Sequence, residues 1–245
     1  MSIPKIIHQS FATNKLPKEL KDNIEKIKKL NPTWEYRFYD DKDVIEFISK
    51  NYESKVLELF NKINPKYGAA RADLFRYLLI YKVGGIWLDI KSSTNEPLDN
   101  ILKDDDYFLL SQWQNRFSEP FKGWGFHRLL THVPGGEFQQ WFIISEKENP
   151  LIKAVIEKVL TNIHNYNIDV FGVGSYGVFV TTGPTAFTLA IEPLLNSHKH
   201  KFVDSIRDLK LEYSIYNSED NSNKVLHRNL YKTHYDKLRE PIVLK

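Results

Sequence analysis

The chain has 245 residues, of which 42% are hydrophobic, and its 34 basic and 31 acidic residues leave a formal charge of only +3. This length fits one large domain or two small ones, and so balanced a charge gives no reason to expect nucleic-acid binding. The sequence contains no cysteine, which excludes disulfides and thiolate metal sites and is compatible with a reducing cytoplasm.

No apolar run approaches the roughly 20 residues that span a bilayer, and the N-terminal residues lack the layout of a signal peptide. We therefore expect a cytoplasmic protein without a transmembrane segment. The six lysines from Lys15 to Lys29 are best explained as a solvated helix face. The alternative is weak attraction to an anionic membrane, which would make the protein peripheral at its inner face.

The first 90 residues alternate predicted strands and helices. Residues 3–9 and 34–39 indicate strands, while residues 16–30 carry apolar side chains at helical spacing until Asn31-Pro32 ends the helix. Residues 43–60 predict one or two further helices. This order indicates an α/β fold with a mainly parallel central sheet.

Beyond residue 91 the pattern is less regular. We predict a short strand at 107–111, an apolar segment at 138–145, and helices at 150–163 and 184–195. The polar residues 217–223 are a candidate for a mobile lid. Residues 172–177 spell GxGxxG but lead into 178–181, which we predict to be a strand, so a dinucleotide site is not expected there.

Residues 67–91 carry the strongest functional signal. Asp73 and Arg76 lie three apart and share one helical face, Gly84-Gly85 ends the helix, and Asp89 follows the short apolar stretch 86–88. A carboxylate at the tip of a buried strand is how α/β proteins build ligand sites. The alternative is a surface ion pair of little energetic value, which we consider the weaker interpretation.

Together with IPKIIHQ at 3–9 and TGP at 182–184, this segment resembles glycosyltransferase family 32. The family pattern AxxDLxRYxxLYxxGGIYLDxD is matched here by Ala70, Asp73, Arg76, Tyr77, Gly84, Gly85 and Asp89. The resemblance implies a GT-A-like, Rossmann-type single domain over 1–245. It also implies retaining transfer of a hexose from a UDP- or GDP-linked sugar to a glycan or glycolipid acceptor, with an α-linkage.

The resemblance further implies a division into a nucleotide-sugar-binding half, 1–111, and an acceptor-binding and lid half, 112–245. The expected donor-binding residues are Gln9, Ser10, Tyr39, Asp73, Arg76, Gly84 and Gly85. The expected acceptor-binding residues are Trp113, Trp124, Gly135, Gly136, Thr182, Gly183 and Pro184, since exposed aromatic rings stack on sugar faces. His8 is either a core histidine or a neighbour of the nucleotide, Tyr39 and Asp40 are candidates for the base pocket, and Trp87 and Trp141 are expected in the core.

The family motif has aspartate at both ends, whereas this chain reads Asp89-Ile90-Lys91. In one alternative, Asp89 holds Mn²⁺ or Mg²⁺ together with a C-terminal ligand, for which His227 is the candidate and His234 the rival. In the other, Lys91 neutralises the diphosphate and so replaces part of the role of the metal. A Lys91 that faces away is disfavoured if the strand continues, because alternate residues share a face. We favour a metal held mainly by Asp89.

For the chemistry itself, Gln112 is expected below the anomeric carbon. Glu137 has no support as a nucleophile, so same-face attack guided by the leaving diphosphate is the default for a retaining transfer. A non-catalytic nucleotide-sugar or glycan binder is the alternative, because Lys91 replaces a metal ligand. A toxin-like enzyme that modifies a protein is a third possibility, disfavoured by the short chain.

Overall fold

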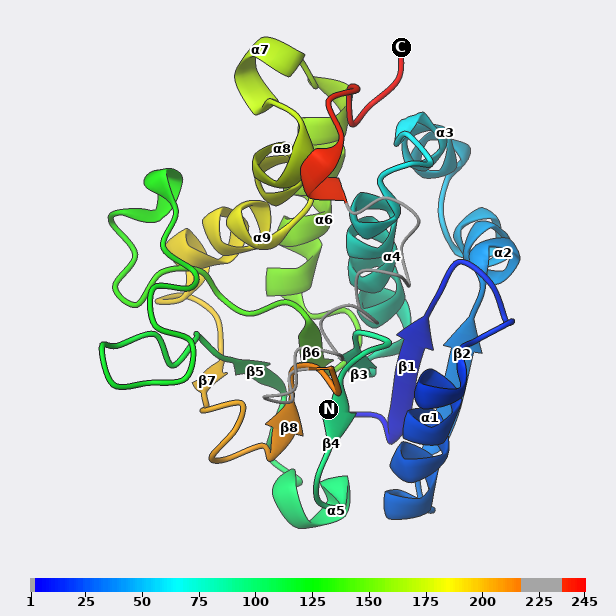
Figure 1. Ribbon diagram of the computed structural model, residues 1–245, viewed down its shortest axis with the longest axis vertical. Coiled ribbons are helices and arrows are strands. Elements are labelled where there is room, and N and C mark those ends of the chain that lie inside the picture. Colours follow the sequence, from blue (N-terminus) through cyan, green and yellow to red (C-terminus); the bar gives the residue numbers. More distant parts are fainter. Residues whose placement is uncertain (1–2, 217–234) are drawn as a thin grey trace.

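The computed structural model describes residues 3–216 and 235–245 (Figure 1). The first half of the chain alternates strands with helices, as the sequence predicts. Its elements are β1 (Ile6–Ser10), α1 (Lys18–Leu30), β2 (Glu35–Tyr39), α2 (Asp41–Asn51), α3 (Ser54–Lys62), α4 (Gly68–Val83), β3 (Gly85–Leu88), β4 (Ser93–Thr94), α5 (Leu98–Ile101) and β5 (Phe108–Leu110).

A long irregular segment follows β5, and helices dominate the rest. The remaining elements are η1 (Arg128–Leu130), β6 (Phe142–Ser145), α6 (Pro150–His164), α7 (Ile168–Phe171), α8 (Gly174–Thr181), α9 (Pro184–Ile191), η2 (Glu192–Leu194), β7 (Lys201–Phe202), β8 (Leu211–Glu212) and η3 (Tyr235–Lys237). No helix in the described ranges has the length and apolar content needed to cross a bilayer.

The main sheet has six strands in the order β2-β1-β3-β6-β5-β7. β1 pairs in parallel with β2 and β3, and β5 pairs in parallel with β7, whereas β6 is antiparallel to β3 and β5. β6 is therefore the one strand of this sheet that runs against the others. The prediction of a mainly parallel α/β sheet is confirmed, and strands from both halves of the chain build it. The division into donor and acceptor halves stays a prediction.

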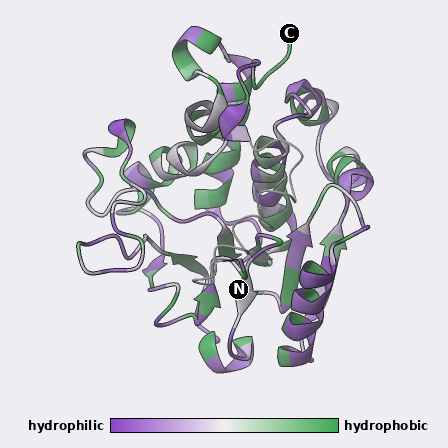
Figure 2. Cartoon of the chain, in the orientation of Figure 1, coloured by the Kyte–Doolittle hydropathy of each residue, from purple (hydrophilic) through white to green (hydrophobic). Residues whose placement is uncertain are grey.

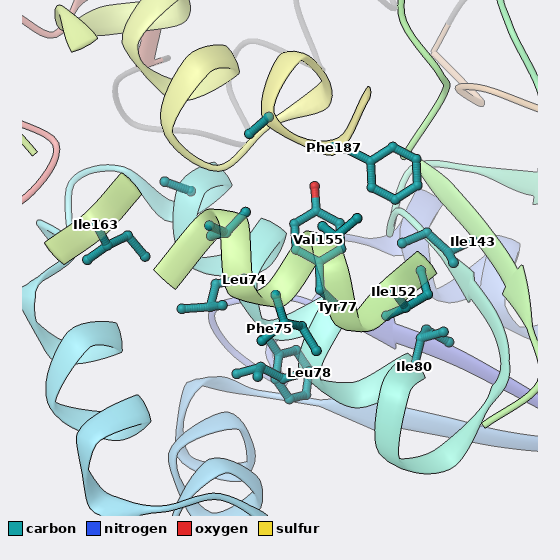
Figure 3. Packing of buried hydrophobic residues seen from close by; sticks show 14 of the residues in the cluster. Leu74, Phe75, Tyr77, Leu78, Ile80, Ile143, Ile152, Val155, Ile163 and Phe187 are labelled. Carbon is teal, nitrogen blue, oxygen red and sulfur yellow. The ribbon is translucent and has the colours of Figure 1, made fainter. Parts of the chain in front are cut away.

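Helices cover both faces of the sheet. On one face α4 packs against α6, and their apolar side chains meet those of α9 and β6 (Figure 3). On the other face, residues of α1 and α5 pack beneath β1 and β3 together with the segment around residues 209–211. In Figure 2 the sheet strands β5 and β6 are mostly green, which fits their position between two apolar layers.

Local signals set several helix starts. Asp40 accepts hydrogen bonds from the backbone N–H groups of Lys42 and Asp43, and the Asp43 side chain accepts from the Asp40 N–H, so a capping box opens α2. Asn149 caps α6 by a single hydrogen bond, which its side-chain oxygen accepts from the Leu151 N–H. Asp40 therefore caps α2, and its contribution to a base pocket stays a prediction.

Residues 178–181 were predicted as a strand, and this is wrong: they form the end of α8. Their β-branched side chains favour strands, but tertiary contacts decide the outcome. The side-chain amide of Asn162 in α6 donates to the carbonyls of Val180 and Thr181. The GxGxxG segment at 172–177 follows the short helix α7 and forms the beginning of α8, so it lacks the preceding strand that a dinucleotide site needs.

Candidate functional site

The parallel strands β1, β2 and β3 end at the same edge of the sheet, and Asp89 is the first residue after β3. Its backbone is fixed from two sides. The Asp89 N–H donates to the carbonyl of Trp141 at 2.8 Å, and its carbonyl accepts from Gln9 Nε2 at 3.0 Å. This is the position at which open α/β sheets bind ligands.

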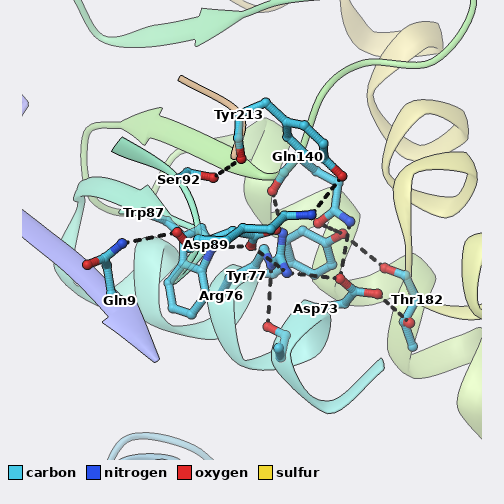
Figure 4. A network of polar contacts seen from close by, with 12 residues as sticks. Gln9, Asp73, Arg76, Tyr77, Trp87, Asp89, Ser92, Gln140, Thr182 and Tyr213 are labelled. Atoms are coloured by element: carbon cyan, nitrogen blue, oxygen red, sulfur yellow. Dashed lines mark hydrogen bonds and ion pairs between the residues drawn. The ribbon is translucent and has the colours of Figure 1, made fainter. Parts of the chain in front are cut away.

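Arg76 of α4 joins two carboxylates beneath this edge (Figure 4). Its Nη2 lies 3.2 Å from Asp73 Oδ1 and 3.1 Å from Asp89 Oδ1. Its Nη1 donates to the carbonyl of Gln140 at 2.5 Å, and the guanidinium stands 5.3 Å from the centre of the Trp87 ring. The guanidinium therefore orients the carboxylate at the strand end.

The inner pair of this network is buried. The Arg76 and Asp73 side chains are 5% and 4% exposed, so the alternative of a surface ion pair is wrong. Asp73 also accepts from Gln140 Nε2 through Oδ1 and from the Thr182 hydroxyl through Oδ2. Burial raises the pKa of the Asp73 carboxyl, and the charge of Arg76 opposes that rise. Direct contact of these two residues with a donor sugar stays a prediction.

Asp89 is the carboxylate of the network that reaches solvent. Its side chain is 25% exposed, and its Oδ1 accepts from Trp87 Nε1 at 3.2 Å as well as from Arg76. Its Oδ2 has no hydrogen-bond partner among residues 3–216 and 235–245. One carboxylate oxygen is thus held inward and the other faces the region outside the sheet edge.

Lys91 does not continue the strand, so the argument that it shares a face with Asp89 is wrong. The Ser92 N–H donates to the Asp89 carbonyl at 2.8 Å, which closes a turn over residues 89–92. Lys91 Nζ donates to the Tyr213 hydroxyl at 2.8 Å and lies 4.1 Å from the centre of that ring. A cation is therefore held two residues beyond the exposed carboxylate.

The predicted residues of β1 and β2 mostly serve the scaffold. Gln9 is fully buried and accepts from the Tyr36 hydroxyl while it donates to Asp89, so it positions the site. His8 is also fully buried, and burial lowers the pKa of its imidazole from 6.5 to about 4. Its Nε2 donates to the Gly84 carbonyl and its Nδ1 accepts from the Tyr39 hydroxyl, which confirms a core histidine. Ser10 lies at the carboxyl end of β1, partly exposed, where a nucleotide contact stays a prediction.

The donor-binding role predicted for Gly84 and Gly85 is corrected by their position. They lie buried at the beginning of β3, whereas Asp89 follows its end. Gly85 has φ +97°, and a Cβ there would stand 2.6 Å from the Ile6 carbonyl oxygen. These glycines end α4 and allow β3 to lie against β1.

The predicted acceptor residues begin where β5 ends. Gln112 donates its amide to the carbonyls of Pro134 and Gly136, and Trp113 is 9% exposed, which contradicts the expected exposed ring. Trp113 Nε1 donates to Glu137 Oε1 at 2.6 Å, and Glu137 Oε2 lies 2.5 Å from His127 Nε2. Both oxygens of Glu137 are engaged, so it is no free nucleophile. The catalytic role of Gln112 stays a prediction.

A shallow cavity of about 410 Å³ opens beside these residues, at the carboxyl ends of β5 and β7. Its polar lining includes Gln112, Gln114, Arg116, Asp204 and Arg207. The backbone joins it to the Asp89 network, because the segment 138–141 bonds to both Ser111 and Asp89. Neighbouring strands are spaced by about 4.8 Å, so the two places are separated by roughly two strand spacings.

Trp124 is 45% exposed and packs against Trp113 and Tyr213, so its ring is accessible, and its contact with an acceptor stays a prediction. The TGP segment is different. Thr182 is fully buried and holds Asp73, so its predicted acceptor contact is corrected to a structural one. Gly183 and Pro184 begin α9. Trp87 and Trp141 are buried, as expected for core residues.

The described residues supply one ligand of the predicted metal site, Asp89. They contain no group of three acidic or histidine side chains that could hold an ion. Asp89 offers one carboxylate oxygen, both oxygens of Asp73 are engaged, and Lys91 cannot ligate a cation. Mg²⁺ and Mn²⁺ take about six hard oxygen ligands. His227, His234 and the predicted lid 217–223 lie outside the described residues.

Sequence reasoning missed the residues that hold the network together. Gln140 contacts Asp73, Arg76 and Tyr77, and Tyr213 holds Lys91. A polar residue inside the apolar run 138–145 was the available signal for Gln140, because an uncharged polar group in such a run needs a partner. Tyr213 carried no comparable signal, since its hydrogen bond from Lys91 joins residues 122 positions apart in the sequence.

Residues 17–108 match the family model described as "Glycosyltransferase sugar-binding region containing DXD motif". The chain is 36% identical over 101 residues to inositol phosphoceramide mannosyltransferase 3 of Schizosaccharomyces pombe. This alignment covers 41% of this chain and 28% of the relative. It is 25% identical over 184 residues to the initiation-specific alpha-1,6-mannosyltransferase of Candida albicans, covering 68% of this chain and 46% of that one.

Among solved structures, the UDP-bound glycosyltransferase domain of the YGT toxin superposes with a TM-score of 0.56 at 8% identity, covering 94% of this chain and 89% of that chain. At this identity the likeness shows the fold, and the predicted GT-A-like fold is confirmed. The family model and the mannosyltransferases support a family 32-like assignment of the matched region. The alignments span between about a quarter and a half of the length of these two curated relatives.

Proposed function

We propose that this chain is a glycosyltransferase that moves a hexose from a UDP- or GDP-linked sugar to a glycan or glycolipid acceptor. The observation that carries the proposal is Asp89, a carboxylate fixed at the carboxyl end of a parallel strand, oriented by a buried arginine and open to solvent on one oxygen. The family match and the names of the relatives, which include a mannosyltransferase for inositol phosphoceramide, support the reaction class and favour mannose.

In this proposal the donor sugar lies over Asp89, with Arg76 and Asp73 forming the floor beneath it. A carboxylate at this position accepts hydrogen bonds from sugar hydroxyls and stabilises the positive charge that develops on the ring as the glycosidic bond breaks. Asp89 can do so because its backbone and its Oδ1 are held before the donor arrives. Such preorganisation favours the transition state over the ground state.

The leaving nucleoside diphosphate gains negative charge in the same step. We assign the neutralisation of this charge to Lys91, which lies two residues after Asp89 and is held by Tyr213. Because both oxygens of Asp73 and of Glu137 are engaged, we retain same-face attack as the route to an α-linkage. We place the acceptor in the cavity lined by Gln112 and its neighbours.

The test is turnover of UDP- and GDP-hexoses, measured as released nucleotide and as transferred sugar, each with and without Mn²⁺. Asp89→Asn should lower kcat by on the order of 100-fold, the usual loss when one transition-state contact is removed. Asp22→Asn, on the exposed face of α1, is the matched control and should leave kcat unchanged. Failure of every such donor, with and without Mn²⁺, would overturn the proposed transfer.

The alternative is a non-catalytic nucleotide-sugar binder, and the ammonium of Lys91 in place of a carboxylate favours it. A thermal-shift screen separates the two. Ligand at 100 times its Kd raises the free energy of unfolding by about 2.7 kcal/mol. A nucleotide-dependent shift without turnover would establish binding alone. An Mn²⁺ requirement in the same screen would support the metal that the family resemblance implies.

A further inference from the structure

The irregular segment between β5 and β6 exposes an unusual amount of apolar surface. We call residues 112–137 the aromatic loop. Phe117, Phe126, Trp124 and Leu129 are 84%, 59%, 45% and 39% exposed. Single exposed apolar side chains are ordinary, but four within 13 residues make a patch that water solvates poorly.

The loop holds these side chains outward by a defined backbone. Asn115 Nδ2 donates to the carbonyls of Trp124 and Gly135 at 2.8 and 2.9 Å. The Glu137 N–H donates to the Gly125 carbonyl at 2.8 Å. A Cβ on Gly136 would stand 2.5 Å from that same carbonyl oxygen, so the backbone at Gly136 lies in close contact with the backbone at Gly125. The exposure is therefore built into the fold.

The same loop carries three exposed cations. Arg116, Lys122 and Arg128 are all exposed, and Lys122 Nζ lies 3.7 Å from the centre of the Phe117 ring. The one acidic side chain at the tip, Glu119, is partly buried and accepts from the backbone of Arg116. Aromatic rings flanked by cations are the composition that binds the interface of an anionic bilayer.

We propose that the aromatic loop docks the protein on an anionic lipid bilayer, with Phe117 and Phe126 inserted at the headgroup level and the three cations on the lipid phosphates. The loop is continuous with the candidate site, because Trp124 packs on Tyr213 and Tyr213 holds Lys91. A bound bilayer would thus lie beside the site of a lipid-linked acceptor. Only this orientation rests on the proposed function, since bilayer binding needs no catalysis.

The lysine-rich helix α1 is the competing membrane contact, and its geometry argues against it. Its apolar residues Leu20, Ile24 and Ile27 are buried against the protein and Leu30 is partly buried, so the helix presents no fully exposed apolar side chain for insertion. Part of its charge is also paired, as in Lys18 with Asp22. In Figure 1 the aromatic loop lies at the left and α1 at the right, so variants of one leave the other intact.

The experiment is cosedimentation of the full chain with vesicles of phosphatidylcholine alone or mixed with phosphatidylglycerol. Replacing Arg116, Lys122 and Arg128 by Gln should weaken binding to the anionic vesicles by on the order of 100-fold, since each surface cation contributes about five-fold. The double variant Phe117→Ser/Phe126→Ser should weaken it at least as much, because each inserted ring contributes at least about ten-fold.

The matched control is Val170→Ser/Tyr176→Ser, which removes exposed apolar side chains elsewhere, at 67% and 51% exposure, and should bind as the parent does. A second readout is quenching of tryptophan fluorescence by brominated lipid, which Trp124→Phe should reduce. No binding to anionic vesicles would overturn the proposal. So would loop variants that stay folded by circular dichroism and bind as tightly as the parent, or loss of binding on replacing the lysines of α1.

Discussion

Replacing Arg76 by methionine tests whether the buried network stabilises the fold and orients Asp89. The side chain is 5% exposed and its Nη2 contacts Asp73 Oδ1 and Asp89 Oδ1 at 3.2 and 3.1 Å. Methionine fills much of the same volume but leaves Asp73 buried beside only the neutral donors of Gln140 and Thr182. An uncompensated buried charge is among the most costly single changes in a protein.

The expected loss of the free energy of unfolding is about 3–5 kcal/mol, the usual cost of breaking a buried pair from one side. For a domain of this size each kcal/mol lowers Tm by about 2–4 °C, so Tm should fall by roughly 6–20 °C. The loss should also shrink in acid. Burial already holds the pKa of Asp73 above its unfolded value, and without the opposing charge of Arg76 this pKa rises further, so the folded variant binds more protons than the unfolded chain and loses stability as pH rises through that window.

Arg37→Met is the matched control, because Arg37 makes a two-point pair with Glu35 while 37% and 56% of the two side chains remain exposed. Solvent screens such a pair, and its loss should cost less than about 1 kcal/mol. Urea denaturation followed by circular dichroism measures both variants. If Arg76→Met cost no more than Arg37→Met, the network would not be a desolvated one, and the account of how Asp89 is oriented would fail.

Three further predictions use the same denaturation assay. Thr182→Val should lower the free energy of unfolding by about 1–3 kcal/mol, because it leaves a buried oxygen of Asp73 without its hydrogen bond. Thr185→Val is the control and should lower it little, because the buried Thr185 hydroxyl has no partner among the described residues. Equal effects of the two variants would contradict this prediction. Gly85→Ala should cost at least about 1–3 kcal/mol for its φ of +97°, with more from the contact with β1, whereas Gly68→Ala has open space and should be tolerated. Burial lowers the pKa of His8 to about 4, so below pH 6.5 the folded state binds fewer protons than the unfolded state. The free energy of unfolding should therefore fall by up to roughly 3 kcal/mol as pH drops from 6.5 to 4. A His8→Gln variant that kept the full acid slope would refute that assignment.

The elements that could be predicted from sequence are those in which the local sequence pattern and the tertiary contacts favour the same secondary structure. Helix α1 has apolar residues at helical spacing, and the same residues are buried in the structure. Strand β2 and helix α6 were predicted nearly to their ends because Asp40 and Asn149 act as local caps next to them. The segment 178–181 shows the limit. Its β-branched residues favour a strand locally, but hydrogen bonds from Asn162, sixteen or more residues earlier, hold it as a helix.

The candidate site divides in the same way. Asp73, Arg76 and Asp89 could be found because a helix period and a strand end place them without knowledge of the rest of the chain. Their burial could not, since it depends on Gln140 and Thr182, which reach them from the second half of the chain. Sequence spacing therefore located the charges but did not show that Arg76 faces inward, toward Asp73, as much as outward, toward Asp89.

The same division explains why the two ends of the Asp89-Ile90-Lys91 motif differ in how firmly the fold constrains them. The backbone of Asp89 is held by Trp141 on one side and Gln9 on the other, and its carboxylate is held by Arg76 and Trp87, so a replacement there changes contacts with two side chains. Lys91 lies past the strand in a turn and is held by Tyr213 alone among described side chains. A replacement at position 91 therefore alters a contact with one described side chain, Tyr213, whereas a replacement of Asp89 alters contacts with both Arg76 and Trp87.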